Sequence, residues 1–450
     1  MVQLDDDSRA ARRRQDREIL RLAVPAFGAL VAEPLFLLAD SAIVGHLGTD
    51  QLAGLGVAGA VLATAVGLFV FLAYATTAAV ARRYGAGDLR AALAQGIDGM
   101  WLAAGLGVLV AAAGLVAAPA VVTLFGPSPD VVPHAVTYLR WSLPGLPAML
   151  VVLAATGVLR GLQDTRTPLA VAATGAGANV VLNYALVYGA GMGIAGSALG
   201  TVLAQVGMAV ALVAVVVRGA RRNGAPLRPD RAGIRLSARA GAPLVVRTLT
   251  LRAALLVTTY VAARQGDVAL AAHQVVSTLW TFLAFALDAV AIAGQAITGR
   301  ALGAGDAAGA RAATRRMVQW GVGAGAVLGL VVAAASGLLA PLFTRDADVR
   351  AAVVAALLVA AVGQPLAGYV FVLDGVLIGA GDGRYLAVAG LWTLLAYAPL
   401  ALVVLLVGPG GAAGLVWLWV AFAAGFMAAR AVTLWLRARG DGWLVLGAVR

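Results

Sequence analysis

Long apolar stretches alternate with short polar connections along the whole chain. By residue number the stretches are 19–45, 52–80, 97–125, 132–159, 167–189, 193–217, 240–263, 269–299, 317–343, 349–379, 385–407 and 412–436. Each reaches or exceeds the roughly 20 residues that a helix needs to cross a hydrocarbon core of about 30 Å. Backbone groups in lipid must hydrogen-bond within their own segment, which favours helices. The pattern predicts an all-α integral membrane protein with twelve transmembrane helices.

The second half of the chain repeats the first in a single register. A shift of 218 positions places Pro25 on Pro243, and the turn 85–88 (GAGD) on the turn 303–306 (GAGD). Such a repeat predicts two copies of one structural unit. Because six helices are an even number, both copies have one orientation and are related by a pseudo-two-fold axis along the membrane normal.

We therefore expect an N-lobe of helices 1–6 over residues 1–218, a cytoplasmic linker over 219–238 and a C-lobe of helices 7–12 over 239–450. Several polar residues have no counterpart in the other copy. The mismatched pairs are Asp40 with Thr258, Asn179 with Tyr397, Asp288 with Val70, and Asp374 with Thr156. We expect functional residues at these positions, because the helical framework occurs twice in the chain and these ionisable groups occur once.

Composition agrees with a membrane protein. Hydrophobic residues make up 62% of the chain and charged residues 12%, and the net charge is +12. The mean hydropathy is +0.92. These values exclude an ordinary soluble globule. All 33 basic residues are arginine. Most lie in the N-terminal tail, the central linker, the even-numbered connections, and the C-terminal end. The last group is Arg430, Arg437, Arg439 and Arg450.

By the positive-inside rule, this distribution places both termini in the cytoplasm. The positive charge therefore reports topology, and we expect no nucleic-acid partner. The chain has no cysteine and three scattered histidines, so no metal centre is expected. No nucleophile–base constellation is visible, which argues against an enzyme and against a bound cofactor. We expect a monomer in the cytoplasmic membrane of a bacterium, in contact with membrane lipid.

Two carboxylates lie in the first apolar stretch. Glu33 and Asp40 are seven residues apart, so two helical turns place them on one face, with Pro34 able to bend the helix between them. Burial favours the protonated form of a carboxyl group, which suits a reversible proton carrier. Alternatively, a buried arginine neutralises Asp40, or Asp40 caps a broken helix.

Pairs of polar residues follow in the fifth and sixth stretches. Asn179 and Asn183 are four residues apart, and Thr201 and Gln205 repeat that spacing. Their oxygens could hydrogen-bond the carboxyl group of Asp40. Gln205 is also a candidate for substrate contact or for coupling the two lobes. Asp40, Asn179, Asn183 and Thr201 could alternatively hold Na⁺. Each pair could also serve only to join two helices.

The second half has its own candidates. Gln274 and Asp288 are fourteen residues apart in the eighth stretch, and Asp374 lies in the tenth. Arg247 or Arg252, in the seventh, could form an ion pair with Asp288 or Asp374. These side chains could instead contact a substrate directly.

Four further acidic residues lie near glycines in short turns: Asp88, Asp164, Asp306 and Asp382. We expect them to cap helices rather than to take part in transport.

Four segments together resemble one family. They are LADSAIVGHLG (38–48), RGLQDTRTP (160–168), AFALD (284–288) and FVLDGVLIGA (371–380). With the two GAGD turns, they resemble the multidrug and toxic compound extrusion (MATE) transporters, specifically the DinF-like branch. The resemblance covers essentially the whole chain. It implies two six-helix lobes around a V-shaped cavity and export of organic, often cationic, compounds driven by entry of H⁺ or Na⁺.

The resemblance also implies roles for particular residues. Asp40 matches the first-helix aspartate that is the key protonation site of DinF-like members, and Asn179 matches the asparagine of that cluster. Related proteins often carry a second aspartate where this chain has Asn183. A mechanism with one carboxylate then depends on Asp40, and Glu33 could partly substitute for the missing group.

The sequence thus predicts a secondary antiporter that exports small organic molecules in exchange for H⁺. A Na⁺-coupled antiporter is the near alternative. A lipid-linked sugar flippase is a second one, since fold alone does not fix the substrate. A flippase would need several cationic residues to hold a pyrophosphate, and Arg140, Arg247 and Arg252 are the candidates within the apolar stretches.

Overall fold

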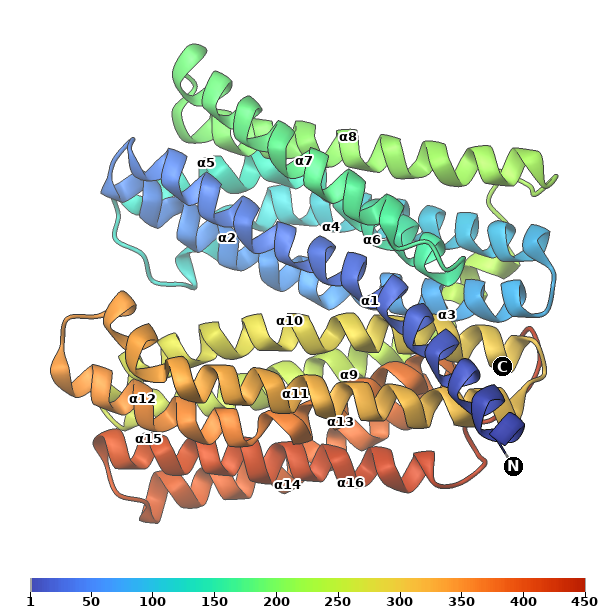
Figure 1. Cartoon of the computed structure of the whole chain (residues 1–450). Coiled ribbons are helices and arrows are strands. Elements are labelled where there is room, and N and C mark those ends of the chain that lie inside the picture. Colours follow the sequence, from blue (N-terminus) through green and yellow to red (C-terminus); the bar gives the residue numbers. More distant parts are fainter. Residues whose placement is uncertain (1, 450) are drawn as a thin grey trace. The chain divides into compact units, whose positions relative to one another are not determined.

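The computed structural model describes residues 2–449, without the side chains of residues 2–11 and of Glu33. The described residues form helices and the turns between them, and no strand. The helices of the first half, shown from blue to green in Figure 1, are α1 (Val2–Gly45), α2 (Thr49–Phe69), α3 (Phe71–Gly85), α4 (Leu89–Thr123), α5 (Val131–Ser142), η1 (Leu143–Gly145), α6 (Leu146–Gly161), α7 (Arg166–Tyr184), η2 (Ala185–Gly189) and α8 (Gly193–Arg222).

The second half continues with a similar order of long helices. Its elements are α9 (Arg231–Arg264), α10 (Asp267–Gly303), α11 (Ala307–Phe343), α12 (Ala347–Val362), α13 (Gln364–Gly379), α14 (Gly383–Val407), α15 (Gly411–Val420), η3 (Ala421–Phe426) and α16 (Met427–Ala438). Short breaks within a span join α2 to α3, α5 to α6, α12 to α13, and α15 to α16. The interruptions of the two halves differ, because α10 is continuous where α2 and α3 are separate and η3 interrupts the last span.

Among the described residues, eleven helices or continuous helical runs are long and apolar enough to cross a membrane. A twelfth span is completed by α12 and α13, which meet at an angle of 52°. Gly363 and Pro365 lie at this bend. Proline has no N–H for a bond to the preceding turn, so the helix restarts there. The predicted class of twelve apolar helices is confirmed, but the tenth span is bent rather than straight.

The chain divides into two compact units. The first unit is Val24–Gly241, and the second is Ala242–Ala448 with the segment that precedes Val24. The segment expected as a linker over 219–238 is largely helical, because α8 ends at Arg222 and α9 begins at Arg231. Its remaining turn contacts α4, where Asp98 accepts a hydrogen bond of 2.9 Å from the backbone N–H of Asp230.

The sequence repeat is reproduced in backbone geometry. Gly87 has a φ of 80° and Gly305 a φ of 76°, a left-handed conformation that glycine adopts without strain. The next residues then cap the following helices as predicted. Asp88 accepts a hydrogen bond from the N–H of Ala91, and Asp306 accepts one from the N–H of Gly309.

The other two acidic turns differ from each other. Asp164 accepts hydrogen bonds from the N–H groups of Arg166 and Thr167, which confirms the expected cap of α7. Asp382 makes no such capping bond to α14 and instead forms an ion pair of 2.6 Å with Arg437. An arginine that the repeat does not supply to the first copy therefore changes the role of this aspartate.

Close glycine contacts also recur in both units. Gly157 on α6 lies against the backbone of Ala73 on α3, and Gly375 on α13 lies in the same way against Ala291 on α10. A Cβ at either glycine would overlap a neighbouring carbonyl group. Membrane helices approach closely through small residues, because lipid provides no hydrophobic force between them. This contact fixes the packing of the central helices in each unit.

Candidate functional site

The buried carboxylate of Asp40 is the centre of a polar cluster in the first unit. Its residue is 1% exposed. The Tyr138 hydroxyl donates a hydrogen bond of 2.9 Å to Oδ2, and the Asn183 amide donates one of 2.8 Å to Oδ1. The Ser197 hydroxyl also donates to Oδ1. Three neutral donors from α5, α7 and α8 therefore hold one acidic side chain of α1.

A second layer of amide and hydroxyl groups surrounds these donors. Asn179 and Asn183, one turn apart on α7, exchange hydrogen bonds of 3.3 Å. Asn179 also donates a hydrogen bond of 3.1 Å to the Thr201 hydroxyl on α8. Asn179 and Asn183 are fully buried. The layer orients Asn183, because an amide that is held at its oxygen cannot turn freely away from Asp40.

A glycine allows α7 and α8 to approach closely enough to build this cluster. Gly200 faces Asn183, and a Cβ at position 200 would overlap the Asn183 side-chain oxygen. Ser197 and Thr201, on either side of Gly200 along α8, then reach the cluster from the same helix. The spacing of small and polar residues on α8 thus places two hydroxyl groups beside the buried acid.

No described arginine or histidine lies within ion-pair distance of Asp40. The printed ion pairs of α1 are those of Glu18 with Arg300 and of Asp16 with Arg316, and neither involves Asp40. The alternative in which a buried arginine neutralises this carboxylate is therefore wrong for the residues that the structure describes. Asp40 does not cap a helix end either, since α1 continues to Gly45.

This arrangement suits either protonation state of Asp40. An ionised carboxylate can accept all three hydrogen bonds. A protonated one carries a donor of its own, so one neighbour must become an acceptor. The hydroxyls of Tyr138 and Ser197 can make that change by rotating the O–H bond. A neutral donor shell can thus follow the proton, whereas a fixed cation would hold the carboxylate in its ionised form.

The structure brings together Asp40, Asn179, Asn183 and Thr201, as the sequence predicts. Gln205, a candidate for substrate contact or lobe coupling, is half-buried and makes no hydrogen bond with the described residues. The side chain of Glu33 lies outside the described residues. Sequence reasoning missed Tyr138 and Ser197. Ser197 precedes Thr201 by four residues and could have been found from helical spacing, but Tyr138 had no such signal.

The second unit has a different centre at the repeated position. Thr258, which corresponds to Asp40, forms a hydrogen bond of 2.6 Å with the hydroxyl of Tyr397, which corresponds to Asn179. The Tyr397 ring contacts Phe422 and Phe426, which belong to a cluster of contacting rings with His273, Trp280 and Trp419. The repeat therefore places an acid in one unit and an aromatic cluster in the other.

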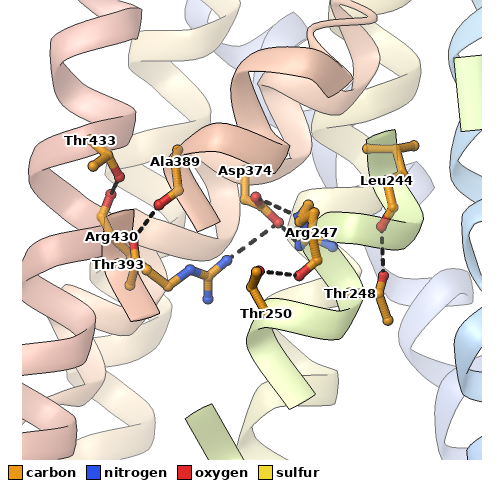
Figure 2. Close-up of polar contacts among 9 residues, drawn as sticks. All are labelled: Leu244, Arg247, Thr248, Thr250, Asp374, Ala389, Thr393, Arg430 and Thr433. Atoms are coloured by element: carbon orange, nitrogen blue, oxygen red, sulfur yellow. Dashed lines mark hydrogen bonds and ion pairs between the residues drawn. The ribbon is translucent and has the colours of Figure 1, made fainter. Parts of the chain in front are cut away.

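Buried charges of the second unit gather instead at Asp374 (Figure 2). Arg247 on α9 donates from Nε to Oδ1 of Asp374 at 3.0 Å and from Nη2 to Oδ2. Arg430 on α16 reaches the same carboxylate, with Nη2 at 3.5 Å from Oδ2. The expected pairing of Arg247 with Asp374 is confirmed. Arg252 is exposed, so it is not the arginine that neutralises Asp374.

The other candidates of the second half lie apart from this trio. Gln274 is exposed on α10, and Asp288 is half-buried and has an interaction partner of its own. Arg430 was counted with the arginines of the C-terminal end. It is 8% exposed and lies within the apolar helical run Gly411–Ala438. The signal was present, since position 430 falls six residues before the end of the apolar stretch 412–436.

Comparisons with known proteins agree with this architecture. The MatE family matches residues 25–185 and 243–403, one segment in each copy of the repeat. "Protein DETOXIFICATION 44, chloroplastic" of Arabidopsis thaliana is 31% identical over 383 residues, covering 82% of this chain and 73% of that protein. "DNA damage-inducible protein F" of Escherichia coli K12 is 31% identical over 298 residues, covering 65% of this chain and 64% of that protein.

Solved structures show the same fold. One is described as the outward-facing conformation of a multidrug resistance MATE family transporter of the MOP superfamily. It superposes with a TM-score of 0.85 at 23% identity, over 94% of this chain and 95% of that one. The family match spans most of the chain, the repeated architecture is the same, and the sequence relatives include a DinF protein. The chain is a multi-pass membrane protein that belongs to the MATE family of multidrug efflux transporters.

Proposed function

We propose that this protein is a proton-coupled antiporter that exports small organic compounds, with Asp40 as the site that carries the proton. One observation supports this most directly. The only acidic side chain of the described cluster is 1% exposed and is held by three neutral donors. Such a group can gain and lose a proton without first breaking an ion pair.

The proposed cycle uses the hydrogen bonds around that carboxylate. A proton from outside neutralises Asp40, and the Tyr138 or Ser197 hydroxyl then turns to accept from the new O–H group. Because these donors belong to α5 and α8, the exchange alters how α1 is held against its neighbours. The organic compound leaves outward in the protonated state. Loss of the proton to the cytoplasm restores the three original bonds and readies the carrier for another compound.

The available driving force is sufficient for useful export. A membrane potential of 100 mV contributes about 2.3 kcal/mol for each charge moved. At about 1.4 kcal/mol per tenfold, that energy supports a concentration ratio of about fiftyfold for a neutral compound, whose exchange for one H⁺ moves one net charge. A single coupling carboxylate therefore suffices.

The arginine distribution supports an orientation with both termini in the cytoplasm of a bacterial cell and the chain in its cytoplasmic membrane. We propose that the monomer is the transporting unit, because the Asp40 cluster is built within one unit of one chain.

The test uses purified protein in liposomes and a panel of fluorescent organic compounds of either charge. The compound is added outside the liposomes, and the interior is made acidic. The wild type should then accumulate the compound inside, because protons leave as the compound enters. Asp40→Asn should abolish that response. Asp50→Asn is the matched control, because it makes the same chemical change at an exposed position in the first turn of α2.

Three results would contradict the proposal. The first is undiminished pH-driven transport by Asp40→Asn. The second is equal loss of transport in Asp50→Asn. The third is transport that follows a Na⁺ jump at constant pH and ignores the pH gradient, which would make Na⁺ the coupling ion.

A further inference from the structure

A groove of about 560 Å³ lies between α10 and α11, which run side by side in the second unit (Figure 1). Polar side chains line one end of the groove, among them Arg316 and Trp320. Apolar side chains line the rest, with Ala286 from α10 and Ala324 and Leu328 from α11. The groove therefore has a polar end and an apolar body.

The apolar body has the dimensions of a lipid chain. From Arg316 to Leu328, α11 rises by about 18 Å, and one leaflet of the hydrocarbon core is about 15 Å deep. Gly323 lines the groove, and a Cβ at this position would have no neighbour within 4 Å, so the groove is open there. Beyond the groove, α11 continues with exposed Leu330 and Val331. A long apolar space that continues into an exposed apolar helix face suits an acyl chain.

The polar end is bordered by the start of α1. Asp16 accepts hydrogen bonds of 2.6 and 2.7 Å from Arg316 and one of 2.8 Å from the Trp320 indole N–H. Arg12 and Arg13 are exposed and lie about one turn before Asp16, on the same side of α1. Three arginines and one carboxylate thus belong to this end of the groove. The end is positively charged even though Arg316 is paired.

This charge has a natural counterpart in the membrane. The positive-inside rule places the arginine-rich ends of the helices on the cytoplasmic side. The lipids of that leaflet are partly acidic, and arginines next to a span attract them. The nearest carboxylate along α1 after Asp16 is that of Glu18, which pairs with Arg300 and does not add free negative charge. An anionic headgroup with an acyl chain below it matches both parts of the groove.

The first copy of the repeat lacks both features. Leu68 and Leu106 stand where the second copy has Ala286 and Ala324. Leucine side chains at these two positions would fill the space that the alanines leave open. Asp98 stands at the position of Arg316, and a carboxylate there would repel an acidic headgroup. The groove therefore results from side chains specific to the second copy, and not from the pair of helices as such.

We propose that this groove binds an acidic phospholipid of the cytoplasmic leaflet. One acyl chain lies along α11 against Ala324 and Leu328, and the phosphate lies near Arg12 and Arg13. Arg316 stays paired with Asp16 and holds the start of α1 at the groove. The site is independent of the coupling ion and of the exported compound.

Trp320 can report what occupies the groove, because bromine atoms on a lipid chain quench tryptophan fluorescence on contact. The protein is reconstituted in vesicles with equal amounts of phosphatidylglycerol and phosphatidylcholine, and the bromine is on the chains of one lipid or of the other. The signal of Trp320 is the difference between the wild type and Trp320→Phe. Random contact gives equal quenching by the two lipids. We expect brominated phosphatidylglycerol to quench Trp320 more strongly than brominated phosphatidylcholine does.

A filled groove should abolish this preference. Ala324→Leu introduces the side chain of the first copy and should make the two lipids quench Trp320 equally. Ala326→Leu makes the same change at an exposed position of α11 outside the groove lining, and should behave as the wild type does. Ala286→Leu narrows the groove from α10 and serves if Ala324→Leu does not fold.

The headgroup contact is tested separately by Arg12→Gln combined with Arg13→Gln. The preference for phosphatidylglycerol should fall about fivefold for each arginine removed, which corresponds to about 1 kcal/mol. Arg221→Gln combined with Arg222→Gln is the matched control, because it removes two exposed arginines from the end of α8. This control should keep the preference of the wild type.

Equal quenching by the two lipids in the wild type would overturn the assignment. So would an unchanged preference in folded Ala324→Leu and Ala286→Leu, or in the variant without Arg12 and Arg13. An equal loss of preference in the Arg221 and Arg222 control would show general attraction of acidic lipid to a basic protein, and would also overturn it. The measurement uses no ion gradient, so its outcome is separate from that of Asp40→Asn in transport.

Discussion

Removal of the Tyr138 hydroxyl should change the pH at which the transporter operates. This hydroxyl donates a hydrogen bond of 2.9 Å to Oδ2 of Asp40, and Tyr138 is 4% exposed. Tyr138→Phe removes the donor and keeps the ring, so packing is preserved. The donor favours the ionised carboxylate over the protonated one. Its loss should therefore let Asp40 keep its proton up to a higher pH.

The size of the shift follows from the strength of the bond. A hydrogen bond to a charged group contributes about 1.5–3 kcal/mol. Since about 1.4 kcal/mol corresponds to one pH unit, the midpoint of the transport–pH curve should rise by about 1–2 units. The two remaining donors, Asn183 and Ser197, still hold the carboxylate, so transport itself should persist.

The assay measures initial rates of substrate exchange in proteoliposomes between acidic and alkaline pH. Tyr188→Phe is the matched control, because the Tyr188 hydroxyl donates to the Ile43 carbonyl at 2.6 Å and does not touch Asp40. Its midpoint should equal that of the wild type. An unchanged or lower midpoint in Tyr138→Phe would refute the reasoning, as would equal shifts in both variants.

Three further predictions concern the same network and its repeat. Asn183→Asp adds a second carboxylate beside Asp40. If both carboxylates titrate, the equilibrium accumulation ratio of the compound should rise from about tenfold to about a hundredfold per unit of pH difference. An unchanged ratio would show that only one proton moves. Gly200→Ala should lower the free energy of unfolding by about 1–3 kcal/mol, because the added Cβ meets Asn183. Gly207→Ala has open space around it and should be neutral or slightly stabilising. Thermal unfolding of the purified proteins compares the two variants, and equal melting temperatures would contradict the contact at Gly200. Tyr397→Phe, at the repeat position of Asn179, should cost about 1 kcal/mol of stability and leave the pH dependence of exchange unchanged; a shifted midpoint would show that the second unit also takes part in proton coupling.

The sequence alone determined the architecture. Twelve apolar stretches, a repeat with a shift of 218 residues and paired GAGD turns are local patterns, and local patterns specify helices, turns and their number. The sequence also identified Asp40, because an ionisable side chain within an apolar stretch is conspicuous wherever the helix packs. Asn179 and Asn183 followed from spacing on one helix, which is fixed by the helical period.

Only the tertiary structure decided which groups meet. Tyr138 is 98 residues from Asp40 in the chain, and Ser197 is 157 residues away. Their contacts depend on how α5 and α8 pack against α1, which no helical period encodes. In the same way, the sequence grouped Arg430 with the other C-terminal arginines, whereas the packing of α16 places it beside Asp374. A periodic pattern tells which face of a helix is apolar, but the partner of that face is set by packing between helices distant in sequence.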